Sequence, residues 1–399
     1  MSDALKQARA HFLAGNAHAE AGRVDEAAAA YKAALALAPG RASVLANLGL
    51  MRCRQARWEA AVDLLTQATA ADPAHTDAWA ALGLAGEALG RWEQAERALA
   101  RAAALGARAG TLSLTRAMCL LRLNRLDEAL AALDEALHLD PTLAEAWSQR
   151  GHLFRETGRL AEAARCYREA LARGAHEALH RYYLAAVTDA DEPPAPPEVY
   201  AQALFDDYAD DFQDHLLHTL RYTAHETLLR PLLDSGARFS RVLDLGCGTG
   251  LCGRLLAPVA DAVDGVDIAP AMVARARASG AYRRVDEGSL VPWLRADPGR
   301  ADLVVAADVF IYTGPLAPVF DAVMPRLAPG GVWAFSVEQA DAGRDLQLRP
   351  SLRYAHGRDS IVALAAAHGL SVRSLWDAPI RHDQGRPVMG WYALLQRPA

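Results

Sequence analysis

A unit of 34 residues repeats five times in the first half of the chain, and this period limits the possible folds more than any other feature of the sequence. Alanine recurs at one position of the unit, at Ala27, Ala61, Ala95, Ala129 and Ala163. A small residue recurs at a second position, at Gly15, Gly49, Gly83, Ala117 and Gly151. Self-similarity of this length indicates stacked supersecondary units, each of which buries its apolar face against its neighbours.

Prolines and the small residues indicate what one unit contains. A glycine or an alanine on a helix lets a second helix approach closely, and each unit has one such residue in each half. Pro39, Pro73 and Pro141 close three of the units, and a proline cannot continue a helix. We therefore expect each unit to be a pair of helices followed by a turn.

The spacing W-x2-L-G at Trp79, Leu82 and Gly83 resembles the tetratricopeptide repeat family, and the resemblance covers about residues 8–177. It implies an α-solenoid whose concave groove binds a peptide or a protein. The polar residues that we expect in that groove are Asn16, Asn47, Thr115, Gln149, His152 and Arg155. A helix at Glu177–Val187 is expected to cap the last repeat, so that the repeat domain spans residues 1–187. The alternative is an array that acts only as a spacer or that joins two copies of the chain in a homodimer.

A proline-rich segment separates this domain from the second half of the chain. Residues 189–198 read DADEPPAPPE, with four prolines and four acidic residues in ten positions. Such a segment does not form the interior of a helix or a strand, so it predicts a semi-rigid spacer. We place the linker at residues 188–199 and the second domain at residues 200–399.

A glycine-rich turn follows a buried strand in the second domain. The segment RVLDLGCGTG, at residues 241–250, joins an apolar strand to a turn with three glycines, which bring backbone amides close to a bound cofactor. Asp267 stands 21 residues after Gly246, at the end of the next strand, where a carboxylate can accept both ribose hydroxyls of a nucleoside. Strands at 302–306, 331–337, 370–375 and 388–395 alternate with helices at 315–327 and 358–368. This alternation predicts a doubly wound α/β sheet.

The spacing of the turn distinguishes two kinds of cofactor. It reads D-x-G-x-G-x-G from Asp244, instead of the G-x-G-x-x-G of dinucleotide-binding proteins. Together with DIAPAMVARAR at residues 267–277, it resembles the class I S-adenosylmethionine-dependent methyltransferases over about residues 198–397. The resemblance implies a Rossmann-like methyltransferase domain after the α-solenoid, an α + α/β chain, with S-adenosyl-L-methionine as the cofactor. A nicotinamide-dependent oxidoreductase is the competing interpretation.

The resemblance also implies which residues hold the methionine and ribose parts of the cofactor. Asp244, Gly246, Cys247 and Gly248 are expected to contact the methionine part. Asp244 would reach its ammonium group directly or through water. Asp267 is expected to bind the ribose hydroxyls.

For the adenine, the resemblance implies packing against Ile268 and Met272. Ser289 stands where many members of the family have an aspartate for the adenine amino group, so backbone amides are the expected substitute. Asp308 follows the fourth strand, where the family lines the methyl-donor pocket.

Three further segments carry a narrower resemblance: FDDYADDF at residues 205–212, ADVFIY at residues 307–312 and RYAH at residues 353–356. With them, the chain resembles bacterial methyltransferases that carry tetratricopeptide repeats. The spacing of Phe205, Tyr208 and Phe212 predicts an amphipathic helix, and these residues are expected to form a lid over the cofactor. Packing in the core alone is the other interpretation of this aromatic stripe.

Methyl transfer is an in-line displacement at a sulfonium methyl, so the enzyme aligns the nucleophile, excludes water and, where needed, removes a proton. His356 is the first candidate for a base, because we expect it in a loop that borders the active cleft; Asp308 and His215 are the others. Tyr312 and Arg353 are expected to orient a carboxylate or a hydroxyl of the substrate. The N-P-P-Y signature of exocyclic-amine methylation is absent after the fourth strand, which favours oxygen or another nucleophile as the methyl acceptor.

The main functional hypothesis is therefore a methyltransferase whose repeats recruit a peptide or protein and whose second domain methylates it on oxygen, with a carboxylate as one candidate acceptor. A methyltransferase for small molecules, with O or N acceptors and repeats that serve oligomerisation, is one alternative. A non-catalytic adaptor with a vestigial cofactor domain is another.

Composition excludes several other classes of protein. A net charge of −6 argues against a protein that mainly binds nucleic acid. We expect no membrane span, because no run of 18 apolar residues occurs. The five cysteines are scattered and none forms a C-x-x-C pair, so we expect reduced thiols, no metal site and a cytoplasmic protein.

Overall fold

A computed structural model describes residues 3–190, 196–197, 200, 221–383 and 385–399. The chain divides into two compact units, Met1–Ala175 and His176–Ala399. In the part of the chain that is described, no helix is long and apolar enough to cross a membrane.

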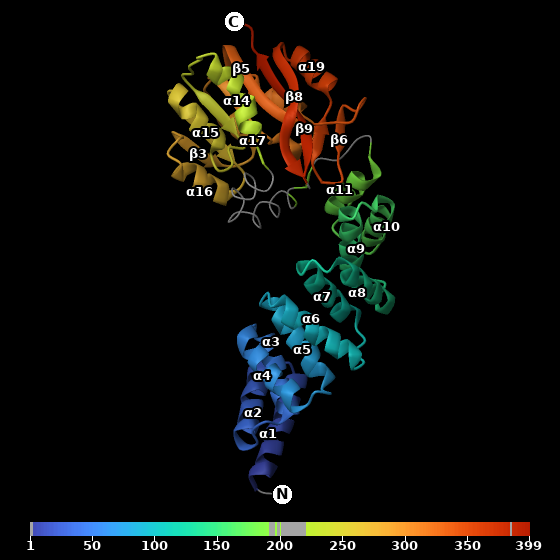
Figure 1. The fold of residues 1–399 in the computed structure, drawn as a ribbon. Helices are drawn as coiled ribbons and strands as arrows, with labels where there is room; N and C mark the ends of the chain where they lie inside the picture. The colour runs from blue at the N-terminus through green and yellow to red at the C-terminus, as the bar shows by residue number, and fades with distance from the viewer. Residues whose placement is uncertain (1–2, 191–195, 198–199, 201–220, 384) are drawn as a thin grey trace. The chain divides into compact units, whose positions relative to one another are not determined.

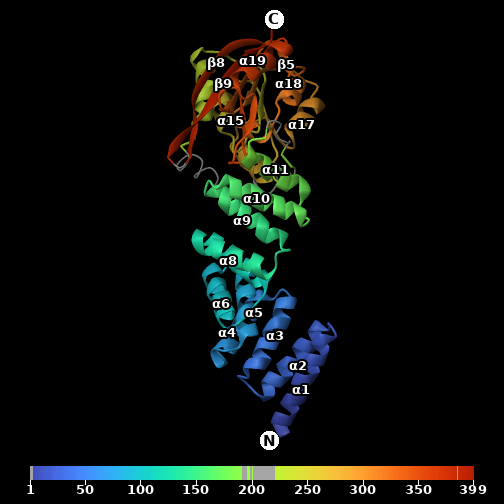
Figure 2. The same cartoon turned by 90° about the vertical axis from the view of Figure 1, so that its right-hand side faces the viewer.

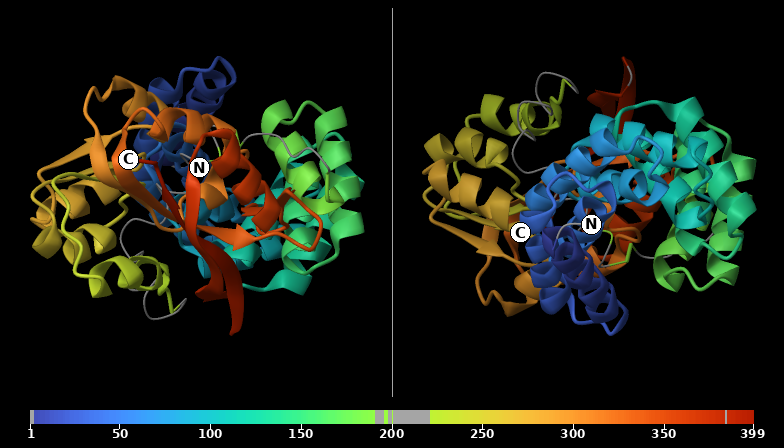
Figure 3. Two further views of the ribbon diagram at one scale, coloured as in Figure 1. Left: turned by 90° about the horizontal axis from the view of Figure 1, so that it is seen from above. Right: turned by 90° about the horizontal axis from the view of Figure 1, so that it is seen from below.

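The first unit is the expected array of helix pairs (Figures 1 and 2). Viewed from below in Figure 3, the pairs follow one another along a curved path from blue to green. The five pairs are α1 (Asp3–Glu20) with α2 (Val24–Leu37), α3 (Ala42–Arg54) with α4 (Trp58–Ala71), α5 (Thr76–Ala88) with α6 (Trp92–Ala104), α7 (Gly110–Arg122) with α8 (Leu126–Leu139), and α9 (Ala144–Glu156) with α10 (Leu160–Ala172).

The repeated glycines are required because the two helices of a pair are in direct contact. A Cβ added at Gly49 would lie 2.6 Å from Leu65, and one added at Gly151 would lie 2.6 Å from Tyr167. The alanines of the second helices have the same function, since all five of them are fully buried. The predicted role of the small residues in close helix approach is confirmed.

The second unit is built on a mixed sheet. Five parallel strands lie in the order β3-β2-β1-β4-β5. They are β1 (Val242–Leu245), β2 (Val263–Asp267), β3 (Arg284–Glu287), β4 (Ala301–Ala306) and β5 (Leu327–Gln339). The strand order reverses between β1 and β4, and open α/β sheets bind ligands at such a point, beyond the carboxyl ends of the strands.

Further strands, both parallel and antiparallel, extend the sheet beyond β5. The long strand β9 (Arg386–Gln396) pairs with β5 and with β8 (Ser371–Asp383). The short strands β7 (Tyr354–His356) and β6 (Leu346–Leu348) continue from the end of β5. The strand β7 was not predicted: the segment was expected to be a loop.

Helices cover both faces of the sheet, as a doubly wound fold requires. One core contains Leu243 and Leu245 of β1 with side chains of α17 (Leu290–Ala296), α18 (Ala317–Val323) and α19 (Arg358–Ala367). The other contains the intervening Val242 with side chains of α14 (Ala224–Asp234) and α15 (Leu251–Leu256). The helix α16 (Pro270–Ala278) packs against β2 and β3.

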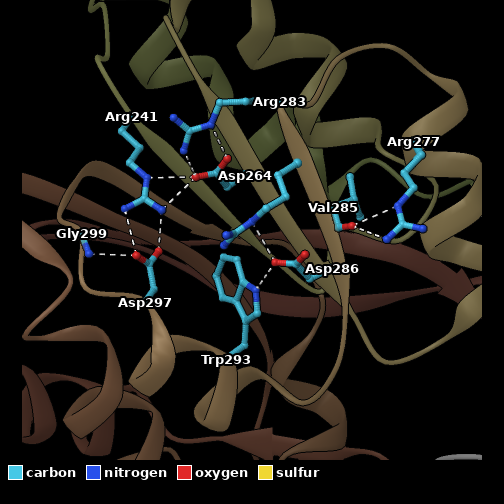
Figure 4. Close-up of polar contacts among 10 residues, drawn as sticks. Arg241, Asp264, Arg277, Arg283, Val285, Asp286, Trp293, Asp297 and Gly299 are labelled. Carbon is cyan, nitrogen blue, oxygen red and sulfur yellow. Dashed lines mark hydrogen bonds and ion pairs between the residues drawn. The ribbon is translucent and has the colours of Figure 1, made fainter.

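Ion pairs join the amino ends of the strands, at the edge opposite the glycine turn (Figure 4). Asp264, fully buried in β2, accepts hydrogen bonds from Arg241, which precedes β1, and from Arg283, which precedes β3. Arg241 also forms a bidentate pair with Asp297, before β4. These four side chains therefore hold four neighbouring segments in register.

The helix α11 (Glu177–Thr188), which was expected to cap the last repeat, falls in the second compact unit. The hydroxyl of Tyr182 donates to the carbonyl oxygen of Leu352 at 2.7 Å, and its ring lies 6.2 Å from that of Tyr354. Asp189 pairs with Arg344. The apolar face of α11 is thus used by the second unit.

Candidate functional site

The glycine turn lies at the carboxyl end of β1, at the point where the strand order reverses. Gly246, Gly248 and Gly250 have φ of 64°, 53° and 91°, a region that favours glycine. A Cβ at Gly246 would lie 2.6 Å from Val309, whereas one at Gly248 would meet no described atom within 4 Å. The turn is therefore packed on one side and open on the other.

Asp267, the last residue of β2, lies beside this turn. Its two carboxylate oxygens accept the backbone N–H of Gly248 at 2.8 Å and of Ala269 at 3.0 Å. A carboxylate can accept about four hydrogen bonds, so it has capacity for a further donor. Burial raises the pKa of Asp267, and the N–H donors of Ala269, Gly248 and Ile268 oppose that rise. The side chain is therefore placed to accept hydroxyl groups.

Asp244, within β1, is 1% exposed and accepts a hydrogen bond from the hydroxyl of Tyr282 at 2.6 Å. Burial raises the pKa of Asp244 to about 7, the hydroxyl of Tyr282 lowers it, and the charge of Asp267 raises it. Cys247 is also buried, and burial raises the pKa of its thiol. A thiol in that state is a poor nucleophile.

The residues expected near adenine differ in exposure. Ile268 follows β2 and is 40% exposed, an unusual value for a large apolar side chain next to a buried strand. Met272, in α16, is 2% exposed, so Ile268 presents more apolar surface than Met272 does. Ser289 is exposed and immediately precedes α17.

Asp308 follows β4, at the same edge of the sheet. Its backbone has φ of 58°, which is costly for a residue other than glycine, and its N–H donates to Oγ of Ser336 at 2.9 Å. Nη1 of Arg381 donates to both oxygens of Asp308, at 3.2 and 2.9 Å, while Nη2 donates to Glu338. One buried guanidinium thus joins two carboxylates.

No sequence motif indicated Arg381. A register shift between Pro379 and Arg381 interrupts the pairing of β8 with β9, so that Ile380 and Arg381 are both buried although they are consecutive. Bulges of this kind change the direction of a side chain and are common beside active sites. No spacing in the sequence signals this bulge.

Tyr312 and Arg353 lie in the same cluster as Asp308. Burial raises the pKa of Tyr312, and Arg353, which forms a hydrogen bond with it, opposes that rise. Arg353 also lowers the pKa of Asp308, which burial raises. Three of the predicted acceptor-side residues, from different elements, are therefore brought together.

His356 does not fit the predicted role of base. It ends the strand β7, is 3% exposed, and has Nε2 2.9 Å from the carbonyl oxygen of Gly314. Its Nδ1 is buried and has no hydrogen-bond partner among the described residues, and burial lowers the pKa of His356 to about 4. A base must reach its proton, and neither ring nitrogen is accessible.

The predicted lid residues Phe205, Tyr208 and Phe212, and the candidate base His215, lie outside the residues that the structure describes. The described residues contain no group of three or more metal-ligating side chains that could hold a metal ion.

Family models match both units. Residues 243–333 match a family described as "Methyltransferase domain". Residues 48–107 and 87–144 match one tetratricopeptide repeat model, and residues 8–41 and 144–173 match a second. The chain joins tetratricopeptide repeats to a methyltransferase domain. The predicted fold class is thereby confirmed.

Individual proteins resemble one unit or the other. Nodulation protein S of Sinorhizobium fredii (strain NBRC 101917 / NGR234) is 31% identical over 120 residues, which are 28% of this chain and 53% of that protein. The match thus spans about half the length of this curated relative.

Two crystal structures also align with parts of the chain. One is the structure of N-methyltransferase NodS from Bradyrhizobium japonicum WM9 in complex with S-adenosyl-L-homocysteine. It has a TM-score of 0.41 and 20% sequence identity, and the alignment covers 49% of this chain and 98% of that chain. The other is the structure of the MamA protein, with a TM-score of 0.40 and 22% sequence identity; the alignment covers 42% of this chain and 92% of that chain.

Proposed function

We propose that this protein is an S-adenosyl-L-methionine-dependent methyltransferase that acts on an oxygen of a peptide or protein recruited by its repeats. The observation that carries the proposal is the open glycine turn at the strand-order reversal, with Asp267 beside it at the end of β2. The match to a methyltransferase domain covers this same turn and strand.

The residues around the turn fit this cofactor. The carboxylate of Asp267 suits the ribose hydroxyls, and the exposed Ile268 suits the adenine ring. Asp244 offers a carboxylate for an ammonium group, and Gly248 leaves room for a ligand against the backbone. When bound, the cofactor supplies an activated methyl group, so the protein has mainly to align the acceptor and exclude water.

The side chains beyond β4 favour an acceptor with an anionic or hydroxyl group. Arg353 and Tyr312 lie beside Asp308, and Arg349 lies 4.0 Å from Glu338. Arg349 also pairs with Asp341 at 3.1 Å, so its charge is already balanced. The guanidinium of Arg353 and the hydroxyl of Tyr312 are the donors that suit an incoming carboxylate or hydroxyl.

The match to tetratricopeptide repeat models supports our assignment of acceptor recruitment to the repeats. Of the expected groove residues, Asn16 and His152 bond to Tyr31 and Tyr167 within the array. Asn47 donates to Asn16. These side chains also stabilise the array, so the recruiting surface would include their remaining exposed atoms. A cytoplasmic location, expected from the cysteines, is part of the same proposal.

Calorimetric titration with S-adenosyl-L-homocysteine tests the cofactor assignment. We expect binding by the wild-type chain and its loss in Asp267→Ala, because the ribose hydroxyls lose their acceptor. Unchanged affinity in the variant would overturn the ribose assignment. Incubation of the full chain with methyl-labelled cofactor and cell proteins, followed by mass localisation, then tests the acceptor: a methyl group on nitrogen would contradict the oxygen proposal.

A further inference from the structure

Tyr282 packs against the elements that form the glycine turn. A Cβ added at Gly253, in α15, would lie 2.2 Å from its Cζ. One added at Gly265, in β2, would lie 3.0 Å from Cε1, and one at Gly250, at the end of the turn, 3.1 Å from Cε2. The aromatic ring therefore occupies the space that three glycines leave open.

The hydroxyl of Tyr282 connects two parts of the cofactor site. It donates to Oδ2 of Asp244 at 2.6 Å and accepts the backbone N–H of Gly253 at 3.1 Å. An ionised carboxylate accepts a hydrogen bond more strongly than a neutral carboxylic acid does, so a donor at this place stabilises the charged form of Asp244. It also ties β1 to the helix that follows the turn.

Other titratable groups near Asp244 do not replace this donor. Asp267, at the end of β2, raises the pKa of Asp244 by its negative charge. The thiols of Cys247 in the turn and Cys252 in α15 have pKa values raised first by burial and then by Asp244, so both stay neutral. Burial likewise raises the pKa of Tyr282, which keeps its proton and remains a donor.

We infer that Tyr282 is a positioning residue of the cofactor site, whose hydroxyl keeps the Asp244 carboxylate ionised and so sets the pH range in which S-adenosylmethionine binds. The inference rests on the proposed function, in which Asp244 receives the ammonium group of the cofactor. Protonation of Asp244 removes that attraction. Affinity should therefore increase as the pH rises through the titration of Asp244.

The test is calorimetric titration of the full chain with S-adenosyl-L-homocysteine between pH 5.5 and pH 8. Tyr282→Phe keeps the ring and its packing but loses the donor. The pH at which the affinity increases should therefore be about one unit higher than in the wild type. The dissociation constant of Tyr282→Phe would then be about fivefold higher than that of the wild type at pH 7 and about twofold higher at pH 8. Tyr182→Phe, which also removes a buried hydroxyl bonded to one carbonyl, is the matched control and should leave the pH profile unchanged.

Three results would overturn the inference. The first is the same profile in wild type and Tyr282→Phe. The second is a loss of affinity in Tyr282→Phe that is equal at all pH values, which marks a packing defect. The third is a wild-type affinity that does not change with pH, which can be measured even if the variants do not fold.

Absence of wild-type binding at every pH would overturn the proposed function as well. Asp244→Asn should bind weakly without pH dependence, which would support the link to this carboxylate.

Discussion

At the scale of single residues, the site depends on buried polar groups whose partners come from distant segments. Asp244 is held by Tyr282, and Asp308 by Arg381. The sequence motifs identified Asp244 and Asp308 but neither partner. Motifs describe residues near one another along the chain, whereas these hydrogen bonds span 38 and 73 positions.

His356 provides a test of one misassigned residue. Its pKa is lowered from 6.5 to about 4 by burial, so its contribution to stability is complete above pH 6.5 and is lost as the pH falls to about 4. We expect the free energy of unfolding to fall by roughly 3 kcal/mol over this range. The fall should be smaller in His356→Gln, because glutamine keeps a donor for Gly314 but does not titrate. Urea unfolding of both proteins between pH 4 and pH 7 measures the difference.

The same variant separates the structural role from the catalytic one. If His356 only packs, His356→Gln retains affinity for S-adenosyl-L-homocysteine and methyl transfer at neutral pH. Equal pH slopes for the two proteins would contradict the buried neutral state, and a complete loss of methyl transfer without unfolding would restore the base assignment.

At the scale of elements, the predictable features are those set by local periodicity. The helix predicted at 358–368 is α19, and the strand predicted at 302–306 is β4. The helix predicted at 315–327 is shorter, Ala317–Val323, and the strands predicted at 370–375 and 388–395 are parts of the longer β8 and β9. Pairing between strands extends them past the apolar runs by which they were recognised.

The amino ends of the strands carry the second stability prediction. Asp264→Asn leaves Arg283 without its partner and weakens the contact to Arg241, so we expect a loss of about 3 kcal/mol, the cost of breaking a buried pair. The pKa of Asp264 is lowered, because hydrogen bonds from Arg283 and Arg241 outweigh burial. The loss should therefore be present at neutral pH and should shrink as the pH falls through that lowered pKa.

Asp261→Asn is the matched control, since Asp261 is exposed and precedes the same strand. It should change stability by less than about 0.5 kcal/mol. Thermal unfolding of both variants provides the comparison, and similar melting temperatures would show that the network adds no net stability.

At the scale of the whole molecule, two units have separate cores and different functions in our proposal. The position of α11 determines how they can be separated. A truncation that begins at His176 keeps Tyr182 and its contact with Leu352, whereas one that begins at Val199 removes them.

We expect the His176–Ala399 truncation to bind S-adenosyl-L-homocysteine with wild-type affinity and to melt several degrees above the Val199–Ala399 truncation, which loses a buried aromatic side chain. Calorimetry and thermal unfolding measure these two properties. If the repeats recruit the acceptor, the His176–Ala399 fragment should also methylate it, with a higher KM than the full chain and a similar kcat. An unchanged KM would instead favour a small-molecule acceptor and repeats that serve oligomerisation.

The sequence alone determined the repeat array, the two-domain plan and the glycine turn with Asp267, because each of these follows from short-range spacing: a 34-residue period, proline stops and a strand–turn–helix motif. Tertiary structure decided the rest. The use of α11 by the second unit, the burial of His356, the bulge that turns Arg381 inward and the contact of Tyr282 with Asp244 all depend on packing between segments far apart in the chain. No local pattern encodes which buried group meets which partner, since that is set by the free energy of packing and desolvation in the assembled fold.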